Sequence, residues 1–81
     1  MRLGSCLCGD VRFEVEAELA PPDACHCVAC RKSSGHVFAS TDVAVEALTI
    51  HDPHDALRWY ASSARVRRGF CGHCGCSLFW A

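Results

Sequence analysis

The sequence has no long apolar run. No stretch of its 81 residues approaches the roughly 20 apolar residues that a membrane-spanning helix needs. The basic residue Arg2 is not followed by the apolar segment of a secretory signal. We therefore expect a cytoplasmic protein that does not contact membranes, in a compartment where thiols stay reduced.

The chain also lacks an excess of charge of either sign. It contains 8 Lys and Arg against 9 Asp and Glu, and its formal net charge is −1. Thiolates on bound zinc would make the sum more negative still. Because phosphate binding needs a basic face, the charge predicts that the protein does not bind nucleic acid.

No window of the sequence predicts a long amphipathic helix, and there are no repeats or linkers, so we expect one domain over residues 1–81. Apolar and polar residues alternate from Val11 to Glu18, which predicts a half-buried strand. Short helical turns are expected after Cys30 and over residues 42–48. Further strands are expected at residues 37–41, 48–51, 57–61, 66–70 and 77–80. The pattern is typical of an all-β fold.

Cysteine is the residue type in excess, with 8 in 81 residues, and seven of them form three tight clusters. A domain of this size has little margin in a single apolar core, so a covalent or metal crosslink is expected. Closely spaced cysteines in a reducing compartment are typical of metal ligands or redox groups. We therefore favour a metal over disulfides.

Two cysteine pairs lie at opposite ends of the chain. Cys6 and Cys8 point the same way on an extended strand, and Cys71 and Cys74 have the spacing of a zinc knuckle. One Zn²⁺ on all four would close nearly the whole chain into a loop. We predict a structural zinc site; the alternative is four buried or separately reactive thiols.

The middle cluster supplies three thiolates, from Cys25, Cys27 and Cys30. Three protein ligands with an open fourth position are typical of a catalytic zinc, so a second Zn²⁺ is expected here. The alternative is a site closed by a fourth protein ligand, with Cys76 as the strongest candidate. The other candidates are His26, His36 and His73.

Basic residues directly follow the middle cysteine cluster, and others precede the last one. Arg31 and Lys32 come directly after Cys30 and predict either an electropositive rim that attracts an anionic ligand or a solvated pair at a turn. Arg65, Arg67 and Arg68 could form a phosphate site. For Arg65 and Arg67, which alternate with Val66, the solvent face of a strand is an equally good interpretation.

The apolar residues Leu78, Phe79 and Trp80 lie in the last expected strand. An unpaired strand edge invites association. We therefore expect either a homodimer through this strand or a longer natural protein that covers it.

Three segments together resemble the glutathione-dependent formaldehyde-activating (Gfa) enzyme family. They are Gly4–Gly9 (GSCLCG), Cys25–Gly35 (CHCVACRKSSG) and Arg68–Gly75 (RGFCGHCG). The resemblance implies a small zinc-stapled β-tent domain of short antiparallel strands. It also implies a structural zinc on Cys6, Cys8, Cys71 and Cys74, and a second zinc on Cys25, Cys27 and Cys30, where glutathione is proposed to engage.

The chain departs from the family in two respects. Family members usually continue past the position of Ala81, so we expect residues 1–81 to lack the family's C-terminal strands. Cys76 stands where the family more often has a small hydroxyl residue, and this thiol could alter the open coordination.

Two functions follow from these patterns. The first, which the resemblance implies, is a carbon–sulfur lyase that condenses formaldehyde with glutathione or a similar small-molecule thiol, with Arg31 or Lys32 holding a substrate carboxylate. The second is a non-catalytic zinc module that binds a protein partner. An open or exchangeable fourth position at the middle cluster would distinguish them.

Overall fold

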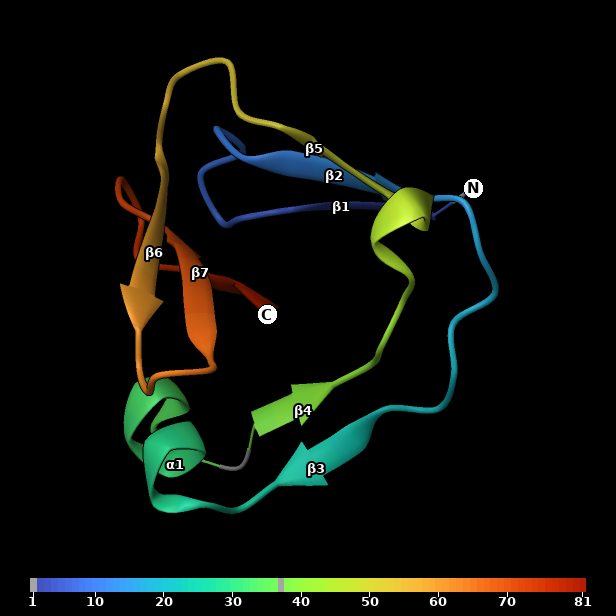
Figure 1. The fold of residues 1–81 in the computed structure, drawn as a ribbon. Helices are drawn as coiled ribbons and strands as arrows, with labels where there is room; N and C mark the ends of the chain where they lie inside the picture. The colour runs from blue at the N-terminus through green and yellow to red at the C-terminus, as the bar shows by residue number, and fades with distance from the viewer. Residues whose placement is uncertain (1, 37) are drawn as a thin grey trace.

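Short antiparallel strands make up most of the protein, in a computed structural model that describes residues 2–36 and 38–81 (Figure 1). The elements in chain order are β1 (Arg2–Ser5), β2 (Arg12–Val15), β3 (Asp23–Cys25), α1 (Val28–Ser34), β4 (Phe38–Ser40), the 3₁₀ turn η1 (Val45–Ala47), β5 (Leu48–His51), β6 (Leu57–Ala61), β7 (Arg67–Cys71) and β8 (Ser77–Trp80). Every strand pairing is antiparallel, which confirms the expected fold class.

The strands form three small sheets, in the orders β1-β2-β5, β3-β4 and β6-β7-β8. Figure 1 shows the first sheet at one end of the molecule and the β3-β4 pair at the other, with α1 beside the turn between β6 and β7. Neither described helix is long and apolar enough to be a candidate membrane span.

The expected strands at residues 48–51, 57–61 and 77–80 have the bounds of β5, β6 and β8, while β7 is shifted by one residue from 66–70. Of the expected strand at 37–41, β4 covers Phe38–Ser40, and Val37 lies outside the described residues. The turn expected over 42–48 is the short η1.

The alternating segment forms a strand only over β2, although Val11 and Val15 are buried as expected. Strands β1 and β3 were not expected from the sequence. Each is short and mostly exposed, and β1 exists through its pairing with β2 rather than through a pattern of its own. The helical turn expected after Cys30 is α1, which begins two residues before Cys30.

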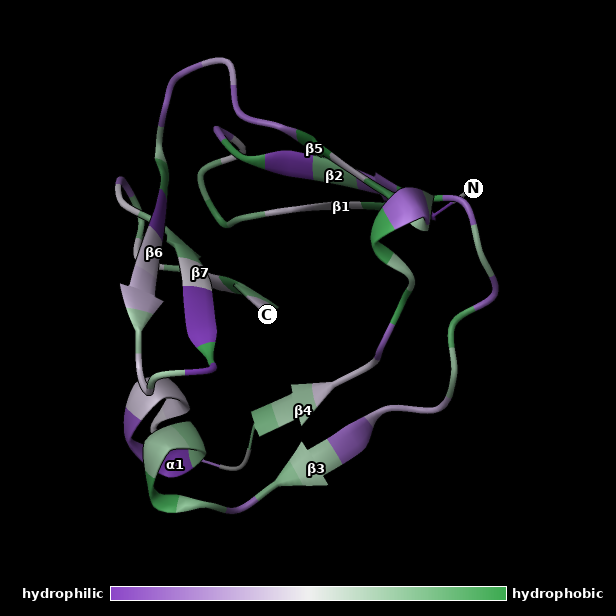
Figure 2. Ribbon diagram, in the orientation of Figure 1, coloured by the Kyte–Doolittle hydropathy of each residue, from purple (hydrophilic) through white to green (hydrophobic). Residues whose placement is uncertain are grey.

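The buried core is small and contains cysteine. One cluster of buried side chains joins Cys6 and Cys71 to Val11 and Ala56. Figure 2 shows hydrophobic and hydrophilic residues interleaved along the strands rather than gathered in one apolar layer. A core of this size contributes little stability by itself, so the fold needs a further crosslink.

Aromatic rings connect the first and third sheets. Phe79 of β8 packs edge-on against Phe13 of β2, with 5.3 Å between ring centroids, and stacks on Trp59 of β6 at 6.1 Å. Phe79 is therefore half-buried even though β8 is one of the two edge strands of its sheet. Trp80 is 53% exposed, and pairing of this edge with a second copy stays a prediction.

Gly4 is required by the close approach of Phe13, its partner across the β1-β2 ladder. A Cβ atom at position 4 would overlap the Phe13 ring, which cannot move freely because it also packs against Phe79. We predict that Gly4→Ala destabilises the zinc-loaded protein by about 1–3 kcal/mol, the usual cost of overpacking. Thermal unfolding should show a melting temperature lowered by several degrees, whereas Ser5→Ala, on the same strand but exposed, should leave it unchanged. Equal melting temperatures for Gly4→Ala and the parent chain would contradict this account.

Candidate metal centres

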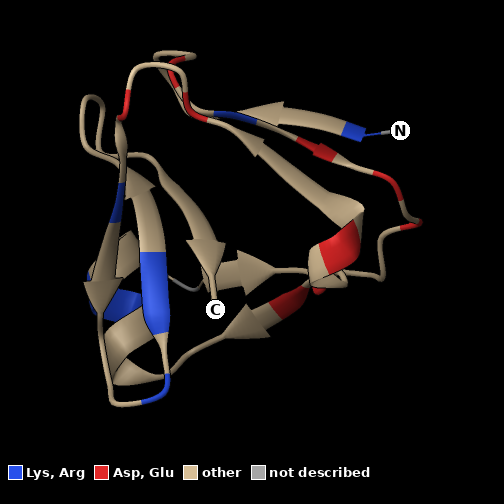
Figure 3. Cartoon of the chain, turned by 45° about the horizontal axis from the view of Figure 1, so that its top comes forward, with Lys and Arg blue, Asp and Glu red and all other residues tan. Residues whose placement is uncertain are grey.

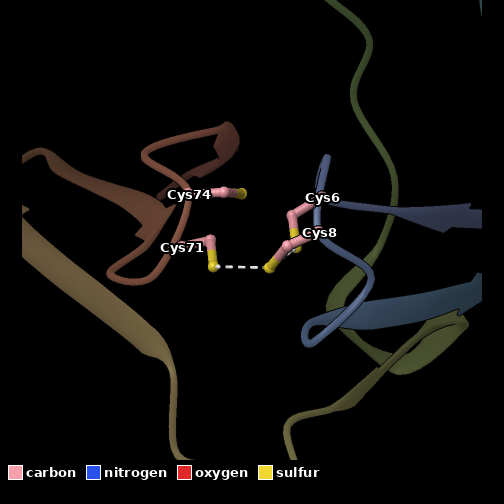
Figure 4. A group of neighbouring side chains, drawn as sticks. All are labelled: Cys6, Cys8, Cys71 and Cys74. Atoms are coloured by element: carbon pink, nitrogen blue, oxygen red, sulfur yellow. Dashed lines mark hydrogen bonds between the residues drawn. The ribbon is translucent and has the colours of Figure 1, made fainter.

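Four cysteine sulfurs from the two ends of the chain converge on one point (Figure 4). Cys6 and Cys8 come from the loop after β1, and Cys71 and Cys74 from the end of β7 and the turn that follows. The four Sγ atoms all lie within 4.8 Å of one another, and the Sγ atoms of Cys8 and Cys71 are 3.8 Å apart. Zinc–sulfur bonds of about 2.3 Å in a tetrahedron put the sulfurs about 3.8 Å apart, so the arrangement fits Zn²⁺.

Tight turns hold each pair in place. The N–H of Cys6 donates to the carbonyl of Val11 at 3.0 Å, and the N–H of Cys71 donates to that of Cys76 at 3.0 Å. Gly75 has a φ of 78°, a left-handed conformation that side chains other than glycine rarely adopt, and this lets the second turn close.

Backbone N–H groups also point at the sulfurs. Val11 donates to Cys6 Sγ at 3.5 Å, and His73 donates to Cys71 Sγ at 3.4 Å. The Val11 N–H is the main cause that lowers the pKa of Cys6 to about 6, because a donor favours the charged thiolate. Thiolates are the form that zinc binds, so this donor favours metal binding at Cys6.

Asp10 connects the two metal-binding loops, a contact that the sequence patterns did not predict. Its Oδ2 lies 2.7 Å from Nδ1 of His73, on the opposite loop, and its Oδ1 lies 3.9 Å from Nε2 of His54. The hydrogen bond with His73 is the main cause that lowers the pKa of the Asp10 carboxyl. His73, a candidate ligand of the middle cluster, therefore lies at the four-cysteine end.

Three further cysteines gather where β3 meets α1. Cys25 ends β3, Cys27 is the N-cap of α1, and Cys30 lies in the first turn of the helix. Their Sγ atoms lie within 4.8 Å of one another, and those of Cys25 and Cys27 are 3.5 Å apart. The three cysteines thus form a three-sulfur group, as their spacing in the sequence predicted.

The environments of these thiols differ. The Cys30 N–H donates to Cys27 Sγ at 3.4 Å, as an N-cap side chain requires. This donor is the main cause that lowers the pKa of Cys27 to about 7. The hydrogen bond with the Cys30 side chain is the main cause that raises the pKa of Cys25. Cys27 is exposed and Cys30 is buried, so the cluster combines an accessible thiol with an anchored one.

Over residues 2–36 and 38–81, the structure brings no fourth His, Cys, Asp or Glu to this three-sulfur group. Cys76 packs instead against the core cluster at the other metal centre, and His26 and His36 are exposed beside α1. A cavity of about 190 Å³ reaches the group. Its lining residues are Cys25, Cys30, Phe38, Ser40, Asp42 and Trp80.

The basic residues near this cluster fall into distinct roles. Arg31 is exposed and its Nε donates to the His26 carbonyl at 2.9 Å, which closes the cysteine-bearing loop. Arg67 lies over the Trp59 ring at 4.7 Å. Arg68, its neighbour, points to the other face of β7 and its Nη2 donates to Cys30 Sγ at 3.4 Å. The strand alternation that put Arg67 outside could have identified Arg68 as an inward residue.

Charge is unevenly distributed over the molecule (Figure 3). Residues 24–41 and 56–81 contain no Asp or Glu and hold all the basic residues except Arg2 and Arg12. The near-zero net charge therefore conceals a basic region around α1 and β6-β7, next to the three-cysteine cluster. Such a region raises the local concentration of anions. That the protein does not bind nucleic acid stays a prediction.

The whole chain matches known proteins, not only its cysteines. The model of the family described as glutathione-dependent formaldehyde-activating enzyme matches residues 1–81. The chain is 28% identical in sequence to a Rhodobacter sphaeroides protein whose crystal structure is known. The two structures have a TM-score of 0.74, and the match covers 98% of this chain and 72% of that chain. No curated protein matches significantly.

We predict that folding depends on zinc at the four-cysteine centre and not at the three-cysteine cluster. A structural zinc contributes on the order of 10 kcal/mol to folding, so Cys71→Ser should abolish soluble, cooperatively unfolding protein. The same change at exposed Cys27 should leave a folded protein with a lower zinc content. Elemental analysis and thermal unfolding of the two variants measure both effects. Equal damage from the two changes, or a native-like transition in zinc-free protein, would contradict the prediction.

Proposed function

The chain belongs to the glutathione-dependent formaldehyde-activating enzyme family, and from this premise we propose that it is a zinc-dependent carbon–sulfur lyase acting on a small-molecule thiol such as glutathione. The observation that supports the proposal best is the group formed by Cys25, Cys27 and Cys30, which has three converging sulfurs and a cavity beside it. Three ligands and room for a fourth are the arrangement of a catalytic zinc site.

The residues of the cluster suit a zinc that binds and releases a thiol. Zinc at this position would bind the ligand as a thiolate and lower its pKa. Cys30 is buried in the first turn of α1. Its backbone N–H donates to the sulfur of Cys27, which favours the thiolate form of Cys27. Phe38 and Trp80 supply apolar walls to the adjoining cavity, while Ser40 and Asp42 supply polar ones.

In the proposed reaction the ligand thiolate attacks the carbonyl carbon of formaldehyde. The carbon–sulfur bond forms, the π electron pair of the carbonyl moves to oxygen, and that oxygen takes one proton. The product is S-(hydroxymethyl)glutathione, and the reverse reaction is the lyase step. The protein contributes chiefly by holding the two reactants together, which replaces a bimolecular encounter. The reaction needs free thiols. We therefore propose that the protein is located in the cytoplasm, where thiols stay reduced.

A non-catalytic zinc module is the second candidate function. It is favoured by the exposed side chain of Trp80 on the edge strand β8, which could contact a protein partner. The same residue lines the cavity at Cys25 and Cys30, so the enzyme proposal also explains its exposure.

The two functions differ in whether the three-cysteine cluster binds a thiol. With Co²⁺ in place of zinc, we expect glutathione to change the visible absorption of the protein as a new sulfur ligand enters. Cys27→Ser should abolish this change, because it removes one of the three sulfurs. Cys76→Ser is the matched control, since Cys76 lies outside both metal centres and should leave the titration intact.

Two results would overturn the proposal. One is a parent protein whose Co²⁺ spectrum does not respond to glutathione, which would favour the non-catalytic module. The other is a loss of the response in Cys76→Ser as complete as in Cys27→Ser, which would mean that the response does not depend specifically on the three-cysteine cluster.

A further inference from the structure

Arg68 connects the central strand of the third sheet to the three-cysteine cluster. Its Nη2 donates to Cys30 Sγ at 3.4 Å, and its Nε donates to Ser62 Oγ at 3.3 Å. Its third nitrogen, Nη1, is fully buried and has no hydrogen-bond partner among residues 2–36 and 38–81. The guanidinium group lies over the Phe38 ring, 5.8 Å from its centroid.

An unpaired, charged donor in this position needs an explanation. Buried polar groups nearly always have a partner, and leaving a charged one without a partner is costly. Arg67, the preceding residue, is exposed on the outer face of the same strand, whereas Arg68 is half-buried on the other face. The fold instead places the guanidinium group inside, with one nitrogen on a cluster sulfur and another without an acceptor. An acceptor supplied by a ligand would complete the hydrogen bonding.

A cavity next to Arg68 has room for such a ligand. Its volume is about 260 Å³, and most of its wall is formed by apolar and aromatic side chains with a few polar groups. Arg68, Ser33, Tyr60 and Ser77 are among the residues that line it. A second hollow, which also includes Arg68, is lined by Lys32 and Ser62. Arg68 thus faces cavity space and also contacts Cys30.

We propose that Arg68 binds the carboxylate of an anionic thiol whose sulfur engages the Cys25, Cys27 and Cys30 cluster. The planar guanidinium group matches the two oxygens of a carboxylate, which makes arginine better suited than lysine to this contact. The inference rests on the proposed function and names the substrate class, a thiol that carries a carboxylate. The sequence predicted Arg31 or Lys32 in this role. Arg31 lines neither of the two cavities that Arg68 lines, and Lys32 lines only the second of them.

Two small thiols that differ in a carboxylate test the inference on the zinc-loaded protein. The probes are 3-mercaptopropionate and 2-mercaptoethanol, and calorimetry measures their dissociation constants. A charge-assisted hydrogen bond corresponds to a preference of roughly 10- to 100-fold for the carboxylated thiol in the parent protein. Arg68→Gln should remove this preference by weakening the binding of 3-mercaptopropionate alone, with 2-mercaptoethanol changed less than about threefold.

Two further variants separate binding from charge and from folding. Arg67→Gln removes the same charge one residue away on the outer face of β7 and should keep the full preference. Arg68→Lys keeps the charge without the planar group and should retain part of the preference. Zinc content and circular dichroism establish whether each variant is folded. If Arg68→Gln does not fold, Arg68→Lys serves as the test variant in its place.

The outcomes distinguish this inference from the proposed function. Thiol binding without a preference for the carboxylate in the parent protein overturns the role of Arg68 and leaves the proposed function standing. If Arg68→Gln weakens the binding of both thiols equally, the role of Arg68 in binding the carboxylate is also overturned, because Arg68 would then act only through Cys30. No binding of either thiol to the parent protein overturns both.

Discussion

The convergence of Cys6, Cys8, Cys71 and Cys74 is the constraint on which the rest of this fold depends. These four residues join the first loop to the last hairpin, so a metal on them closes almost the entire chain. Two of them are also half of the buried core cluster, with Val11 and Ala56 as its other members. The apolar core and the metal centre are therefore one structure, and losing the metal would open the core as well.

The part of the chain from β3 to β4 has fewer strand partners than the rest. β3 and β4 form a two-stranded sheet of their own, and such a pair is marginal in water unless other groups support it. Among the described residues, support comes from Arg68, which reaches Cys30, and from Phe38 beneath its guanidinium group. The three-cysteine cluster thus lies beside the smallest of the described sheets. The proposed binding and release of a ligand would benefit from the lower cost of opening such a region.

Sequence patterns predicted what depends on local spacing. Cysteines with one or two residues between them predicted both sulfur groups, and the expected bounds of β5, β6 and β8 were correct. What the sequence could not give depends on contacts between distant segments. β1 is a strand only because β2 lies beside it, and the Asp10–His73 tie joins loops more than sixty residues apart. The basic region was hidden because a net charge averages over faces that the fold separates.

The two cysteine groups differ in the number of sulfurs they offer and in which of their thiols are accessible. In the four-cysteine group Cys6 and Cys71 are 3% and 0% exposed, whereas Cys8 is exposed. Cys27 is exposed at the start of a helix that supplies an N–H to its sulfur, which lowers its pKa without burying it. A thiolate that is both stabilised and reachable is the reactive kind. The four-cysteine centre offers four sulfurs to one metal ion, whereas the three-cysteine cluster offers three, and this difference is the physical basis for proposing ligand exchange at the smaller group.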